Sequence, residues 1–220
     1  ASGKTAPVGA CAKKAGAKEI VVMDCHGAGG DYTFNSLLAA ELEDGCEFVV
    51  QNEWTEYTEF LEAGCDAALF IGMHAKAGTP DGVLSHTVSG QGWHDLRFNG
   101  VSVGETGINA ALCGNWNCPV LLVTGDRATC REAQALLGDG LTTVEVKVGL
   151  GRYSMRSKTP RDACDQIEDA AKRALKDLSA VEPYDPGRPC EITIEFTFVD
   201  RLVEYRNRRG VEQIDDLTLV

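Results

Sequence analysis

The sequence predicts an α/β fold: a mostly parallel sheet with helices on both faces, followed by a small β-rich C-terminal portion. Short apolar runs alternate with amphipathic segments along most of the 220 residues, which is typical of a parallel sheet built from strand–helix–strand units. A hydrophobic content of 44% is enough for a substantial core. A proline- and glycine-rich segment at 182–189 interrupts the pattern. We therefore expect an α/β core at residues 1–181 and a linker with a β-rich portion at 182–220.

The predicted strands are short runs rich in Val, Ile and Leu. In the core they are Glu19–Met23, Glu47–Val50, Ala67–Ile71, Val120–Thr124 and Thr142–Val148. Beyond the linker, Glu191–Val199 alternates apolar and polar residues, as a half-buried strand does. A last strand is expected at Leu217–Val220, after an arginine-rich turn at 206–209.

The predicted helices lie between these strands. Amphipathic or small-residue segments place them at Ser2–Gly16, Phe34–Leu42, Trp54–Ala63 and Gly107–Cys113. Asp126 is expected to cap a helix that runs to Leu137, and capping is favoured over a catalytic role for its carboxylate. Pro160 suits the first turn of a helix at Arg161–Leu178.

Composition limits the functions that the chain can have. A net charge of −12 and a pI near 4.8 disfavour binding to nucleic acid or to an anionic membrane. The sequence contains neither an apolar run near 20 residues nor a signal-peptide pattern, so a soluble, cytoplasmic protein is expected. The nine cysteines form no Cys-x-x-Cys pair, and most are expected to be small buried residues; Cys46, Cys65, Cys113 and Cys118 are expected to be free thiols. Cys25 is a poor candidate nucleophile because its neighbour His26 points to the opposite face of a strand.

Four residues with metal-ligand chemistry are the best indication of function. His74, His86 and Glu105 fall in one short stretch, and His26 follows an apolar strand. All three histidines are expected at strand ends, where α/β sheets place their ligands. A single histidine there is more often a hydrogen-bonded structural residue, but histidines combined with a carboxylate are typical of zinc hydrolases. His94 is expected on the surface.

Several motifs in order carry a resemblance to a known family. They are Asp24-Cys-His26, Gly72-Met-His74-Ala, Gly82-Val-Leu-Ser-His86, Val103-Gly-Glu105-Thr-Gly-Ile-Asn109-Ala and Pro119-Val-Leu-Leu-Val-Thr-Gly-Asp126-Arg. Over residues 17–200 the chain resembles the zinc-dependent D-aminopeptidases of the dipeptide-transport operon. The resemblance implies a metallohydrolase that cleaves an amide next to a free amine in short peptides, D-amino-acid peptides included, or in amino-acid amides. It also implies a homo-oligomeric ring.

The resemblance also implies a role for each of the four residues. His26 and Glu105 would bind one zinc ion, His74 would bind a second, and His86 would be the catalytic histidine. Two zinc ions about 3.5–4 Å apart would share a hydroxide and polarise the scissile carbonyl. His86 would protonate the leaving amine or stabilise the oxyanion.

One family motif is missing from the sequence. The family opens with a strand that carries Asp-x-Glu-Gly, and this chain has no Asp-x-Glu. We expect the missing strand, with its zinc ligands, on a small companion chain that arises by proteolytic processing or from a split gene, because its loss would expose sheet edges. A truncated chain and a non-catalytic binding or assembly subunit are the alternatives. A metal-dependent amidase, lactam hydrolase or ester hydrolase is a third possible function.

Overall fold

The main sheet has four strands in the order β3-β6-β7-β8. The computed structural model describes residues 12–24, 43–49 and 58–220. β3 (Ala68–Met73), β6 (Val120–Asp126) and β7 (Thr142–Gly151) are parallel, whereas β8 (Ser154–Ser157) is antiparallel to β7. Every residue of β6 is buried, as expected for a central parallel strand with both faces covered. The predicted α/β class is therefore confirmed.

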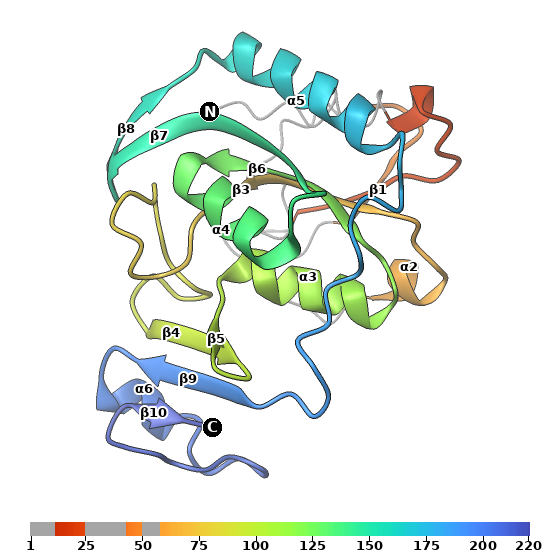
Figure 1. Cartoon of the computed structure of the whole chain (residues 1–220). Helices are drawn as coiled ribbons and strands as arrows, with labels where there is room; N and C mark the ends of the chain where they lie inside the picture. Colours follow the sequence, from red (N-terminus) through yellow and green to blue (C-terminus); the bar gives the residue numbers. More distant parts are fainter. Residues whose placement is uncertain (1–11, 25–42, 50–57) are drawn as a thin grey trace.

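Helices cover both faces of this sheet (Figure 1). α5 (Pro160–Ala174) packs on one face, and α3 (Glu105–Asn115) and α4 (Arg127–Leu137) pack on the other. As predicted, Pro160 lies in the first turn of α5, which Thr159 caps by accepting a hydrogen bond from the Asp162 N–H. The core between these layers is formed mainly by aliphatic side chains of the central strands and by small residues of α5.

A second sheet is antiparallel and joins two distant parts of the chain. Its order is β10-β9-β4-β5, with β10 at Thr218–Leu219, β9 at Ile192–Phe196, β4 at Trp93–Phe98 and β5 at Val101–Ser102. The two predicted C-terminal strands are thus present, but they pair with β4 and β5, which we did not predict. Residues 199–203 form the short helix α6 (Val199–Val203) and do not extend the strand. The division of the chain at residue 181 stays a prediction.

The described N-terminal elements are short. β1 (Val21–Met23) pairs in parallel with β2 (Glu47–Val49), close to the predicted strands. α2 (Glu59–Glu62) forms the end of the helix predicted at 54–63. The helix predicted at 34–42 and most of that at 2–16 lie outside the described residues. Among the described residues, no helix has the length and apolar character needed to cross a membrane.

Candidate metal centre

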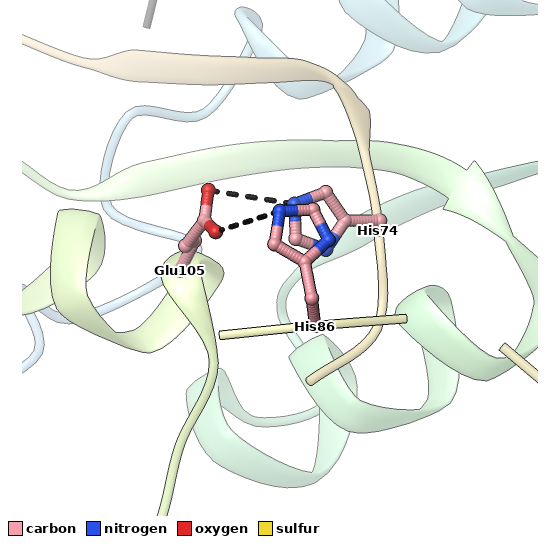
Figure 2. A group of neighbouring side chains, drawn as sticks. All are labelled: His74, His86 and Glu105. Carbon is pink, nitrogen blue, oxygen red and sulfur yellow. Dashed lines mark ion pairs between the residues drawn. The ribbon is translucent and has the colours of Figure 1, made fainter. Parts of the chain in front are cut away.

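Three of the four predicted site residues meet at the carboxyl end of β3. His74 follows the last residue of β3, Glu105 is the first residue of α3, and His86 lies on the loop that joins β3 to β4 (Figure 2). The strand-end prediction is right for His74 and wrong for His86, because the chain around His86 follows irregular turns. His26 lies outside the described residues. His94 is exposed on β4, as predicted.

The donor atoms of these three residues have a spacing that suits a metal ion. His74 Nε2 lies 3.4 Å from Glu105 Oε2, and His86 Nε2 lies 3.4 Å from Glu105 Oε1. All three ligand atoms lie within 4.8 Å of one another. Two ligands of one tetrahedral zinc ion are about 3.3–3.6 Å apart, given bond lengths of about 2.0–2.2 Å. The two distances to Glu105 are therefore compatible with zinc ligation.

Backbone contacts fix the direction of both imidazole rings. His74 Nδ1 lies 3.1 Å from the carbonyl oxygen of Ala75, and His86 Nδ1 lies 2.7 Å from that of Leu84. A carbonyl oxygen only accepts hydrogen bonds, so each Nδ1 carries a proton and each Nε2 faces Glu105. The rings stack with centroids 3.9 Å apart and an interplanar angle of 18°. Carbonyl-anchored imidazoles of this kind are common among metal ligands.

Without a metal, the site is held by charge. Burial lowers the pKa of His74, but the hydrogen bond and negative charge of Glu105 outweigh it and leave the pKa raised. Burial raises the pKa of Glu105, but contacts with His74, the charge of His86 and the Val88 N–H outweigh it and leave the pKa lowered. A protonated His74 and an ionised Glu105 are therefore favoured, and a cation could take the place of the proton on His74.

A buried carboxylate on the neighbouring strand holds the loop of His86. Asp126, at the end of β6, is 0% exposed. Its Oδ1 caps α4, as predicted, by accepting hydrogen bonds from the N–H (2.8 Å) and hydroxyl (2.9 Å) of Thr129. Its Oδ2 accepts a hydrogen bond from the Val83 N–H at 2.6 Å. This second contact spans 43 residues, and no local sequence pattern could have indicated it.

Two further contacts place His74 and Glu105 side by side. Glu132 of α4 accepts hydrogen bonds from the Lys76 N–H at 3.0 Å and from the Thr79 hydroxyl at 2.5 Å. A Cβ at Gly104, the residue before α3, would lie 2.8 Å from the Cβ of Lys76. Only glycine allows this approach, which brings the start of α3 against the chain that leaves β3.

The loop around His86 is strained and firmly held. Leu84 (φ 54°) and Val88 (φ 58°) flank His86 in the left-handed region, which is unfavourable for side chains of this kind. Such strain costs about 1–3 kcal/mol per residue and persists only where surrounding contacts impose it. Here the Val88 N–H donates to Glu105 Oε1 at 2.9 Å, and the His86 N–H donates to the Ala75 carbonyl at 3.2 Å.

Comparisons with known proteins agree on one family. A family model described as D-aminopeptidase matches residues 4–220. The D-aminopeptidase of Bacillus subtilis (strain 168) is 31% identical over 182 residues, which are 82% of this chain and 64% of that protein. The chain thus spans slightly less than two thirds of that relative's length. The solved structure of the zinc-dependent D-aminopeptidase DppA from Bacillus subtilis, described as a self-compartmentalizing protease, superposes with a TM-score of 0.88 at 27% identity. That match covers 98% of this chain and 77% of the other.

Proposed function

Because the chain belongs to the D-aminopeptidase family, we propose that it is a zinc-dependent aminopeptidase. Its substrates are short peptides or amino-acid amides with a free amine next to the scissile bond, and the family favours D-residues at that position. The observation that carries this proposal is the cluster of His74, His86 and Glu105, in which both Nε2 atoms face one carboxylate.

We carry the roles of these residues over from the resemblance to the family. We assign two zinc ions to the site, with His26 and Glu105 as ligands of one and His74 as a ligand of the other. When bound, zinc supplies a hydroxide at neutral pH and polarises the scissile carbonyl. His86 has its Nδ1 held by the Leu84 carbonyl, so only its Nε2 is free to exchange protons. That nitrogen would accept the proton lost by the attacking water and deliver it to the nitrogen of the leaving amine as the C–N bond breaks.

The solved relative is described as self-compartmentalizing, and we propose that this chain also forms a closed homo-oligomer. Enclosure would restrict the site to peptides small enough to enter. We place the protein in the cytoplasm. Sedimentation of the natively purified protein should show a mass that is a multiple of the single chain, whereas a monomer would contradict this part of the proposal.

Two variants separate metal binding from proton transfer. The protein, purified with any chain that accompanies it and supplied with zinc, should bind two zinc ions per chain and release D-alanine from D-Ala-D-Ala and from D-alanine amide. His74→Ala should lose zinc and turnover together. His86→Ala should keep its zinc and lose turnover by about 10²–10⁴-fold. His94→Ala, at an exposed histidine outside the site, is the matched control.

Elemental analysis gives the zinc content, and chromatography of the released amino acid gives the rate. The proposal fails if the zinc-loaded wild-type protein releases no amino acid from any short D- or L-peptide or amide. Unchanged zinc content and turnover in His74→Ala would remove His74 from the metal site.

A further inference from the structure

Arg152 lies next to His86, although the two are far apart in the sequence. It occupies the two-residue turn between β7 and β8, and its carbonyl accepts a hydrogen bond from the Leu84 N–H at 2.8 Å. Its Nη2 donates to the Gly90 carbonyl at 3.3 Å. A Cβ at Gly90 would lie 3.0 Å from that Nη2 and 3.9 Å from His86 Cβ. A methyl group at Gly90 would thus contact both the guanidinium of Arg152 and the Cβ of His86.

The guanidinium of Arg152 has unused hydrogen-bonding capacity. Within the described ranges no carboxylate forms an ion pair with it, whereas Arg97, Arg127, Arg131 and Arg201 all form one. Its Nε is buried and has no hydrogen-bond partner there. A guanidinium that forms no ion pair with the described residues can bind the two oxygens of a ligand carboxylate. These features favour an anionic ligand at this position.

Exposed apolar side chains lie near Arg152 in the sequence and on the loop that hydrogen-bonds to its backbone. Leu150 is 70% exposed and Tyr153 is 81% exposed, and Leu84 and Met155 are also exposed. The guanidinium lies 5.4 Å from the centre of the Tyr153 ring. A ligand with an apolar side chain and a carboxylate matches this surface.

We propose that Arg152 binds the C-terminal carboxylate of the leaving residue, so that the site selects dipeptides with a free C-terminus. The inference rests on the proposed function and names its substrate class. His86 protonates the leaving amine, so a side chain beside His86 lies on the leaving-group side of the scissile bond. One extended residue spans about 3.3–3.6 Å, so the carboxylate of the leaving residue would lie within reach of a neighbour of His86.

The test compares substrates that differ only in their carboxylates. They are D-Ala-D-Ala, its C-terminal amide, and D-Ala-D-Asp amide, whose only carboxylate is on the side chain. The wild-type protein should prefer D-Ala-D-Ala over its amide by about ten- to a hundredfold in kcat/KM, the range expected for hydrogen bonds between charged groups. In Arg152→Gln this preference should disappear through a higher KM for D-Ala-D-Ala.

Two further variants control for charge and folding. Arg152→Lys keeps the charge and should retain part of the preference. Arg156→Gln removes an exposed arginine from the same hairpin and should retain all of it. Calorimetry with the zinc-stripped protein gives a readout without turnover: D-Ala-D-Ala should bind more weakly to Arg152→Gln than to Arg156→Gln.

Each remaining result counts against a stated part of the proposal. Equal hydrolysis of D-Ala-D-Ala and its amide by the wild type would overturn the role of Arg152 and leave the proposed function standing. Faster hydrolysis of D-Ala-D-Asp amide than of D-Ala-D-Ala would overturn the assignment to the C-terminus. If the wild type hydrolyses none of these substrates, the proposed function fails. If Arg152→Gln and Arg156→Gln bind D-Ala-D-Ala equally in the calorimeter, the role of Arg152 is overturned.

Discussion

Replacing Asp126 by serine should separate the two contacts of this carboxylate. Serine is a good helix cap, so the variant can still accept the hydrogen bond from the Thr129 N–H that begins α4. Its side chain has one oxygen and cannot also reach the Val83 N–H, which Asp126 Oδ2 accepts at 2.6 Å. The variant therefore releases the loop of His86 while keeping the helix capped.

The loss of stability in Asp126→Ser follows from the burial of both Asp126 and Val83. Val83 is 6% exposed and Asp126 is 0% exposed, so the Val83 N–H has little access to bulk water once the contact is lost. A hydrogen bond to a charged group contributes about 1.5–3 kcal/mol, and we expect the free energy of unfolding to fall by that amount. Asp126→Ala also loses the cap and should cost about 1 kcal/mol more. A displacement of His86 by about 1 Å would reduce turnover by about 10²-fold.

Urea unfolding and steady-state hydrolysis of D-Ala-D-Ala would measure both effects. The control is Thr159→Ala, which removes the cap of α5 on the opposite face of the sheet. It should lower stability by about 1 kcal/mol and leave kcat unchanged. The reasoning is refuted if Asp126→Ser keeps kcat within twofold of the wild type, or if Thr159→Ala lowers kcat equally.

Two further predictions concern His74, Glu105 and Gly104. Without zinc, the contact between His74 and Glu105 should stabilise the fold most between pH 4.5 and 6.5, the usual pKa values of the two groups. That stability should be lost as the pH rises through the raised pKa of His74 or falls through the lowered pKa of Glu105. Urea unfolding at several pH values would measure this dependence, and Glu105→Gln should make the free energy of unfolding depend less on pH. Zinc affinity, measured by chelator competition, should instead increase steadily with pH. In Gly104→Ala the new Cβ would lie 2.8 Å from that of Lys76, so the free energy of unfolding should fall by about 1–3 kcal/mol and zinc should bind more weakly. A variant as stable as the wild type would contradict the close approach of these two residues.

Local patterns were sufficient to predict the main sheet and its best-defined helices. The apolar runs gave β3, β6 and β7, and capping residues gave the starts of α4 and α5. β4 was missed because Trp93–Phe98 mixes charged and apolar residues, and its pairing with β9 is set by tertiary contacts. Strand length and pairing across the chain thus limited the prediction.

Local patterns likewise predicted only part of the candidate site. His74, His86 and Glu105 were found because their residue types and short spacing suggest a ligand set, and the structure brings them together. The second contact of Asp126 and the position of Arg152 were not found, because each depends on residues that are distant in the sequence. Positioning groups give no local pattern, whereas candidate ligands do.

The way the His86 loop is held has a consequence for how substrate range could evolve. Its backbone is tied to Asp126 and to Glu105, so a substitution there would disturb the reactive groups. Leu150 lies near the end of β7 and Tyr153 lies in the turn between β7 and β8, and both side chains extend into solvent beside the same site. Random mutagenesis confined to that turn should therefore change which peptides are accepted while sparing the hydrolytic chemistry, which makes it the natural place to begin directed evolution.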